Sequence, residues 1–314
     1  MPRSGLRATL QSLRGRLARG ELLPWRLSHL GGPYNTLLGV HLRRVRLRRE
    51  VQTQEGDLPD DTTVVIGHRN RADYRLRNAI QSLKRQENPG GSVRILLVDY
   101  GSEPGQQSEL RAIARDLAVE LLTPSPRREW NRSHCLNIGI RHAATKYVLL
   151  SDVDVIFGPT YVAEAVRALR EDPLAVVYSP CLHLPESSSP ELEAAARRQG
   201  WLDPEPLRAL GVIRTAGEFS TGMVMTRRRF LERVRGLDEF YHTWGVEDVD
   251  LSRRLLWLGL RPMSLRQKSY YLHQWHPRQE GIPPEIVESA KARNTDHFER
   301  AVVIRRNPAG WGEG

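Results

Sequence analysis

The chain has 314 residues, of which 39% are hydrophobic and 27% charged, and this composition excludes a collagen-like, coiled-coil or wholly disordered protein. Its 47 Lys and Arg residues against 37 Asp and Glu residues give a formal net charge of +10. The sequence has no uninterrupted apolar run of about 20 residues, the length that a membrane-spanning helix needs. Cys135 and Cys181 are the only cysteines, so we expect neither a disulfide framework nor a cysteine zinc site.

The positive charge is concentrated near the N-terminus. Residues 1–50 contain eleven Arg and no Lys against two Glu, a net charge of +9, and the remainder is nearly neutral. A basic amphipathic helix is predicted from leucines at helical spacing, namely Leu6, Leu10, Leu13 and Leu17. This extension is either solvated or an interfacial helix that binds anionic lipid, and nucleic-acid binding is the least favoured alternative. The N-terminus lacks the apolar region of a secretory signal, so a cytoplasmic location is expected.

From residue 62 onward, strand and helix patterns alternate, which is typical of an α/β domain with a largely parallel sheet. Strands are predicted at residues 64–66, 93–98, 119–122, 147–150, 178–180, 222–226 and 270–272. Helices are predicted at residues 74–85, 110–117, 132–144, 191–198, 230–234 and 248–258. The proline-rich residues 180–218 are expected to form an irregular segment, either a surface linker or a lid over a ligand.

Two aspartates, Asp152 and Asp154, directly follow the apolar strand at residues 147–150. Side chains at i and i+2 of an extended segment point the same way, so both carboxylates are expected to face one cation. Mg²⁺ and Mn²⁺ prefer such oxygen ligands. The carboxyl ends of strands in open α/β sheets are also where ligands bind. We therefore predict a metal site here, with turn-capping aspartates as the alternative.

Other polar residues also follow predicted strands. Asp99 is expected either to accept the N–H of a nucleotide base or to complete an Asx turn. The cluster at residues 68–71 includes Arg69 and Arg71, whose cationic forks suit a diphosphate or a ribose. His273 and His276 follow the last strand, and neutral imidazole would supplement aspartate ligands around Mn²⁺.

Acidic residues stand directly after a Trp and a Gly at the start of a predicted helix. Glu247, Asp248 and Asp250 follow Trp244 closely. One of the three could cap the helix, because carboxylates favour its positive end. Three acids are more than a helix cap requires. A carboxylate beside the flat face of an aromatic ring can hold and deprotonate sugar hydroxyls.

Taken together, these motifs resemble the GT-A fold glycosyltransferases, specifically the β-1,4-galactosyltransferase-like group and the related bacterial family 2 enzymes. The likeness runs from about residue 63 to residue 278. Five blocks occur in the family's order: residues 68–71, residues 130–132 with 136–139, residues 151–154, residues 219–225, and residues 236–238 with 244–248. The resemblance implies a Rossmann-like α/β fold, with a mostly parallel central sheet flanked by helices.

The resemblance also implies a donor site. Arg69 and Arg71 would contact the diphosphate of a UDP-sugar, Asp99 would face the uracil, and Arg132 would lie near the donor. The group around the metal, Mn²⁺ or Mg²⁺, and the ribose would be formed by Asp152, Asp154, His273 and His276. Within that group Asp154 is the preferred direct ligand, and the two histidines complete the coordination.

For the reaction, the resemblance implies that Trp244 stacks on a sugar, Glu247 binds hydroxyls and Asp248 is the general base. The expected function is metal-dependent inverting transfer of a hexose or N-acetylhexosamine from a UDP-sugar to a saccharide or glycolipid hydroxyl. Val246 and Val249 stand where relatives carry Gly and Asp, which leaves the donor and acceptor identities open.

The predicted organisation has three parts: a basic extension at residues 1–56, the GT-A catalytic domain at residues 57–280, and a C-terminal tail at residues 281–314. Attachment to an anionic membrane through residues 1–50 would place the protein at the inner face of the membrane. Two alternatives remain. A sugar-phosphate nucleotidyltransferase is disfavoured because no Gly-rich phosphate loop with a following Lys occurs near the N-terminus. A non-catalytic sugar- or membrane-binding protein is the other.

Overall fold

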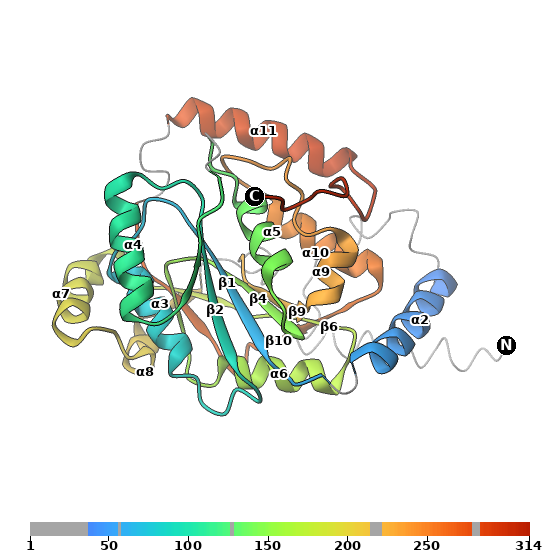
Figure 1. Cartoon of the computed structure of the whole chain (residues 1–314), viewed down its shortest axis with the longest axis horizontal. Coiled ribbons are helices and arrows are strands. Elements are labelled where there is room, and N and C mark those ends of the chain that lie inside the picture. The colour runs from blue at the N-terminus through green and yellow to red at the C-terminus, as the bar shows by residue number, and fades with distance from the viewer. Residues whose placement is uncertain (1–36, 56–57, 126–128, 214–221, 278–282) are drawn as a thin grey trace.

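The computed structural model describes residues 37–55, 58–125, 129–213, 222–277 and 283–314, with side chains from residue 40 onward. A seven-stranded sheet forms its centre, in the order β10-β6-β9-β4-β1-β2-β3 (Figure 1). All neighbouring pairs are parallel except those of β9, which is antiparallel to β4 and β6. The strands are β1 Thr62–His68, β2 Val93–Asp99, β3 Glu120–Leu122, β4 Tyr147–Ser151, β6 Ala175–Tyr178, β9 Val224–Arg227 and β10 Arg261–Ser264. The predicted mostly parallel α/β sheet is confirmed.

One predicted strand is displaced. The sequence analysis placed a strand at residues 178–180, whereas β6 ends at Tyr178 and β7 begins at Cys181. Pro180 lies between them, and a proline has no N–H to contribute to a sheet ladder. The chain therefore leaves the large sheet at this point and enters a second one.

Helices cover both faces of the large sheet. Alternation along β1 sends Val64 and Ile66 into one core and Val65 into the other. Helices α3 Tyr74–Lys84, α4 Pro104–Asp116 and α6 Tyr161–Glu171 pack into the first core. The second core includes side chains from α2 Leu37–Glu55, α5 Arg132–His142, α9 Arg228–Val234 and α10 Glu247–Leu258. Helices α3, α4 and α6 each bury one apolar face, whereas α5 and α10 are buried on nearly all sides.

A four-stranded sheet, β5-β11-β7-β8, stands beside the first. Its strands are β5 Val155–Phe157, β7 Cys181–His183, β8 Val212–Ile213 and β11 Tyr271–His273. The described part of residues 180–218 carries α7 Ser189–Gln199, α8 Pro204–Leu207 and two short 3-10 turns at Glu186–Ser188 and Arg208–Leu210. Its Ala196, Leu202 and Leu207 pack with Tyr270 and Leu272 in a third small core. This segment is folded over most of its length, unlike the irregular excursion expected.

Contacts cross both predicted domain boundaries. Helix α2 buries Leu47 and Val51 in the second core, and Glu55 pairs with Arg227 at 2.9 Å. At the other end, α11 Pro284–Arg300 lies across the top of the molecule in Figure 1, and Trp311 is buried in the second core. The predicted helix near residues 6–17 lies outside the described residues. Within the described ranges, no helix is both long enough and apolar enough to cross a bilayer.

Asn137 on α5 ties that helix to the turn after α9. Its Oδ1 accepts the backbone N–H of Leu237 at 2.8 Å, and its Nδ2 donates to the Leu237 carbonyl at 2.8 Å. The side chain is fully buried. The Asn137 amide therefore joins two of the sequence blocks, residues 136–139 and residues 236–238. The chain after residue 238 leads to Trp244 and Asp248.

Replacing Asn137 by Ala is expected to lower the free energy of unfolding by about 1 to 3 kcal/mol, because the buried N–H of Leu237 would lose its acceptor. The Leu237 carbonyl would keep the bond donated by Asn307. Urea unfolding followed by circular dichroism measures the change. Gln199→Ala, at an exposed position on α7, is the control and should change stability by less than about 0.5 kcal/mol. Equal stability of the two variants would contradict this role.

Candidate active site

The chain turns sharply after β4, and this turn separates the two aspartates that follow. Residues 153–154 form a turn between β4 and β5 instead of the extended segment that the sequence analysis assumed. The side chain of Asp154 is 7% exposed and that of Asp152 is 37% exposed. Because the backbone turns, the two carboxylates meet different partners. The expected extended segment is therefore wrong, whereas a cation shared by both carboxylates stays a prediction.

Asp154 lies among two histidines and an arginine. His276 Nε2 is 3.1 Å from Asp154 Oδ2, and His273 Nε2 is 3.8 Å from Asp154 Oδ1. The antiparallel pairing of β11 with β5 sets His273 opposite Val155, and Gln274 N–H donates to the Asp154 carbonyl at 2.8 Å. Asp154, His273 and His276 each offer a ligand atom, and these atoms lie within 4.8 Å of one another.

The charge state of this group suits a metal. Burial alone would raise the pKa of Asp154, but the hydrogen bond from His276 and nearby positive charge hold it well below its ordinary value. Arg71 contributes to that charge, with its guanidinium 3.1 Å from Asp154 Oδ2. Burial lowers the pKa of His273, which keeps its imidazole neutral at pH 7. An ionised carboxylate and neutral imidazole are the forms that bind divalent ions.

Asp152 belongs to a second group, centred on Arg132. Arg132 Nε donates to Asp152 Oδ1 at 2.7 Å, and Arg132 Nη2 donates to the Gly222 carbonyl at 3.1 Å. Glu247 Oε1 lies 3.8 Å from Arg132 Nη1. Burial disfavours the charge, yet the carboxylates of Asp152 and Glu247 raise the pKa of Arg132 above its ordinary value. Within the described part of the chain, Asp152 is not among the clustered metal-binding side chains.

Asp248 lies at the start of α10 and accepts two backbone hydrogen bonds. Gly222 N–H donates to its Oδ2 at 3.2 Å, and Val249 N–H donates to its Oδ1 at 2.7 Å. Burial and the neighbouring carboxylate of Glu247 raise the pKa of Asp248 to about 7. A carboxyl group with this pKa can both take up and release a proton near neutral pH.

The loop before α10 presents Trp244 on a strained backbone. Thr243 and Val246 adopt φ angles of +69° and +64°, a region that β-branched residues seldom enter. Helix α11 holds this loop in place, because Asn294 Nδ2 donates to the Trp244 carbonyl at 2.5 Å. The Trp244 side chain is left 47% exposed, with Lys291 Nζ 4.9 Å from the ring centroid.

Asp99 is more deeply buried than we expect for a residue that contacts a nucleotide base. It is 2% exposed, and its Oδ1 accepts hydrogen bonds from the Ser102 hydroxyl at 2.5 Å and the Ser102 backbone N–H at 3.3 Å. His68 Nδ1 lies 3.3 Å from the same oxygen. Burial alone would raise the pKa of Asp99, but the hydrogen bonds from His68 and Ser102 lower it overall. Contact with a nucleotide base would require this loop to move. Arg69, on the loop after β1, is partly exposed.

The structure also brings together residues that the sequence analysis did not single out. His183 on β7 lies beside His273, with ring centroids 5.0 Å apart, because β7 pairs with β11. Gly222 serves both Arg132 and Asp248 through its backbone, and a Cβ there would lie 3.0 Å from Asp152 Oδ2 and from the Arg132 guanidinium. Its φ of +76° favours glycine. The glycine within residues 219–225 was a readable signal, whereas the β7–β11 pairing was not.

Comparison with known proteins was made with this geometry in hand. Residues 63–235 match glycosyl transferase family 2, and residues 207–277 match a family described as the N-terminal domain of galactosyltransferase. The second match contains Asp248, His273 and His276. Together the two matches include every residue of the two groups described above.

Two curated relatives are both validoxylamine A glucosyltransferases. The one from Streptomyces hygroscopicus subsp. limoneus is 26% identical over 273 residues, covering 79% of this chain and 57% of the relative. The one from Streptomyces hygroscopicus subsp. jinggangensis (strain 5008) has the same identity and covers 79% of this chain and 61% of the relative. The chain therefore spans less than two thirds of the length of either relative.

Among solved structures, GalNAc-T7 with UDP, GalNAc and Mn²⁺ superposes with a TM-score of 0.53. Its sequence identity is 14%, over 71% of this chain and 45% of that chain, so the likeness concerns the fold alone. The GT-A fold expected from the sequence is confirmed. With more than half of its residues matched, the chain belongs to glycosyl transferase family 2.

Proposed function

We propose that this protein is a metal-dependent inverting glycosyltransferase. It transfers a hexose or N-acetylhexosamine from a UDP-sugar to a hydroxyl group of a saccharide or glycolipid. The observation that carries the proposal is the difference between two carboxylates at one edge of the sheet. Asp154 is held ionised among histidines, while the pKa of Asp248 is raised to about 7. Metal binding and proton transfer need these two states.

Asp154, His273 and His276 fit a divalent cation and would hold it. One carboxylate oxygen and two imidazole nitrogens form a donor set that Mn²⁺ accepts, and Mg²⁺ is less suited because it prefers oxygen ligands. When bound, the ion would neutralise the charge that develops on the leaving diphosphate. The Mn²⁺ and UDP present in the GalNAc-T7 structure are consistent with this choice.

The donor would lie between the two groups of charged residues. Arg71 adjoins Asp154, so its guanidinium can meet the same diphosphate that the metal site faces. Arg69 follows β1 on the same loop, and Arg132 supplies a second cation at Asp152. Asp152, partly exposed, remains the residue proposed for the ribose. Asp99 remains the residue proposed for the uracil, after movement of its loop.

Asp248 would act as the general base. Its carboxylate is oriented by the backbone N–H groups of Gly222 and Val249, which leave each oxygen a further lone pair. It would take the proton of the acceptor hydroxyl as that oxygen attacks the anomeric carbon and the bond to the diphosphate breaks. Attack from the face opposite the leaving group gives a single displacement with inversion. Glu247, held near Arg132, would bind a donor or acceptor hydroxyl.

The acceptor would stack on Trp244. Its half-exposed ring belongs to the residue three positions before Glu247, and α11 fixes the backbone of this loop through Asn294. Aromatic faces bind the apolar face of a sugar ring, while polar groups nearby select its hydroxyls. Helix α11 therefore supports the acceptor side of the site.

The proposed location is the cytoplasm, with association at the inner face of the membrane.

Replacing His276 by Ala is expected to weaken Mn²⁺ binding at least tenfold, because one of three ligands is removed. Titration of free Mn²⁺ by electron paramagnetic resonance measures this without any substrate. His142→Ala is the matched control, since His142 is exposed on α5 and pairs with Glu120. Unchanged Mn²⁺ affinity in His276→Ala would contradict the assignment.

Replacing Asp248 by Asn is expected to leave UDP affinity within about twofold and to lower the transfer rate by about 10² to 10⁴-fold, the usual contribution of a general base. Calorimetry measures the first quantity and release of UDP measures the second. Asp296→Asn, on the exposed side of α11 and paired with Arg300, is the control. Full transfer activity in Asp248→Asn would place the base elsewhere.

The pH dependence follows from the raised pKa of Asp248. Only the deprotonated carboxylate accepts a proton, so kcat/KM should increase with pH and level off above an apparent pKa of about 7. The measurement is kcat/KM across pH 5 to 9 at saturating Mn²⁺. A profile that is flat through pH 7 would contradict the raised pKa or the role of this residue.

A further inference from the structure

A surface far from the active site combines arginines with exposed apolar side chains. On α2, Leu42 is 59% exposed and Val45 is 39% exposed, and both lie on the outward side of the helix. After α11, Val302 and Val303 are 48% and 47% exposed. The name α2 face is used here for this surface, which consists of Leu42, Val45, Arg46, Arg49, Val302, Val303 and Arg305.

Hydrogen bonds and ion pairs tie both parts of the α2 face to Arg233 on α9. Arg233 on α9 pairs with Glu50 of α2 at 2.6 Å, and Arg305 Nε donates to the Arg233 carbonyl at 3.0 Å. Arg44 Nε also donates to the Gly259 carbonyl at the end of α10, at 2.8 Å. Helix α2 and Arg305 therefore adjoin the same residue of α9, at one corner of the molecule.

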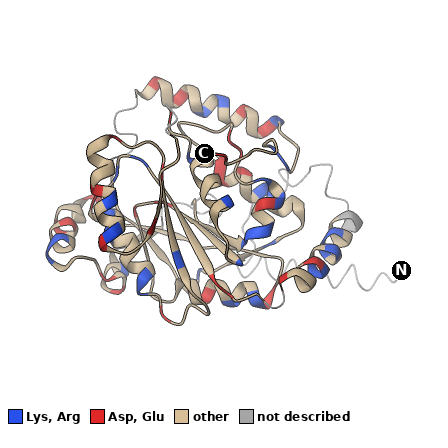
Figure 2. Ribbon diagram, in the orientation of Figure 1, with Lys and Arg blue, Asp and Glu red and all other residues tan. Residues whose placement is uncertain are grey.

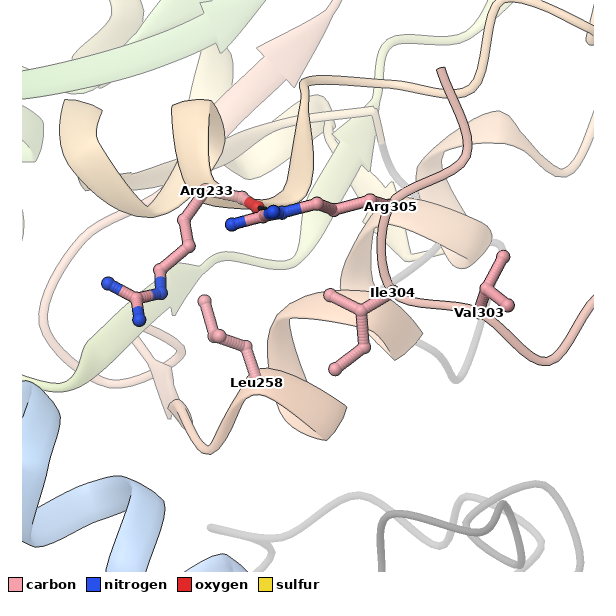
Figure 3. A pocket seen from close by; sticks show the side chains of 5 residues that line it. All are labelled: Arg233, Leu258, Val303, Ile304 and Arg305. Atoms are coloured by element: carbon pink, nitrogen blue, oxygen red, sulfur yellow. Dashed lines mark hydrogen bonds between the residues drawn. The ribbon is translucent and has the colours of Figure 1, made fainter. Parts of the chain in front are cut away.

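A groove of about 330 Å³ lies in this corner (Figure 3). Leu258, Val303 and Ile304 supply its apolar lining, and Arg233 and Arg305 supply its charged groups. The groove thus offers apolar side chains and guanidinium groups together. A single exposed valine needs no explanation, whereas apolar groups gathered among cations do.

The charge of α2 is directed outward. The helix contains five Arg and two Glu residues, and Figure 2 shows the blue bands along it. Glu55 is buried against Arg227, and Glu50 is shared by Arg46 of the same helix and by Arg229 and Arg233 on α9. The side chain of Arg46 is 74% exposed although it pairs with Glu50 at 2.9 Å, and Arg49 is exposed as well. Because three guanidinium groups share the single charge of Glu50, this side of the helix keeps a net positive charge.

We infer that the α2 face docks on a membrane surface that contains anionic phospholipid. Guanidinium groups bind phosphate. Burial of leucine and valine side chains at the boundary between headgroups and acyl chains lowers the free energy of the bound state. Nucleic acid would satisfy the arginines but would not bury the four exposed apolar side chains. Helix α2 adjoins the C-terminal end of α10 through Arg44 and Gly259, about 18 Å along a 12-residue helix from Glu247, so docking through α2 leaves the active site open. The inference does not depend on the proposed reaction.

Flotation of the full chain with lipid vesicles tests the docking. Wild type should bind vesicles of phosphatidylcholine with phosphatidylglycerol and not vesicles of phosphatidylcholine alone. The double variant Arg46→Gln/Arg49→Gln should partition about 30-fold less, since each arginine near an anionic surface contributes about 1 kcal/mol. Val302→Ser/Val303→Ser should also weaken binding. The control is Arg167→Gln/Arg197→Gln, which removes two exposed arginines from α6 and α7. Residues 1–36 are present in every variant, so the comparison isolates the α2 face.

Each remaining outcome decides against the docking. Failure of wild type to bind anionic vesicles would overturn it, as would equal binding by wild type and the α2 arginine variant. Binding to duplex DNA that falls in the arginine variant, with vesicle binding unaffected by the valine variant, would assign the arginines to nucleic acid. Release of UDP in the absence of vesicles should be unchanged in all variants, which separates this test from that of the proposed reaction.

Discussion

The burial of the Asp154 carboxylate at the end of β4 is the constraint on which the rest of the site depends. An ionised carboxylate that is withdrawn from water costs several kcal/mol unless opposite charge and hydrogen bonds surround it. Arg71 comes from the loop after β1, and His273 and His276 come from β11 and the chain beyond it. Two segments distant in sequence from Asp154 therefore converge on its side chain. Pairing of β5 with β11 provides the geometry, which explains why the small sheet stands beside the large one.

Three carboxylates at the same sheet edge are placed in different environments, and their chemistry follows from that difference. Asp154 is kept ionised by histidines and Arg71, and Asp152 is paired with Arg132. Burial and the carboxylate of Glu247 raise the pKa of Asp248, although the charge of Arg132 opposes this shift. Gly222 links the last two groups, because its carbonyl accepts from Arg132 and its N–H donates to Asp248. A change at one carboxylate is therefore expected to affect the other through this backbone.

Local patterns in the sequence predicted the strands that lead into the site. Apolar runs located β1, β2 and β4, and the strand ends correctly indicated where polar residues gather. Helix α6 has buried residues at helical spacing, such as Val162, Val166 and Leu169, and this spacing is visible in the sequence. The separation of Asp152 from Asp154 depends on a turn, and the support of Trp244 by Asn294 joins residues 50 positions apart. Neither of these leaves a local pattern in the sequence.

The central claim is that this sheet edge binds a UDP-sugar together with a divalent ion. The most direct measurement is the affinity for UDP and for GDP by calorimetry, with Mn²⁺ and again with excess chelator. The account predicts that UDP binds more tightly than GDP, and that chelation weakens UDP binding at least tenfold, because only arginine side chains would then face the diphosphate. Equal affinity for UDP with Mn²⁺ and with chelator would contradict the account.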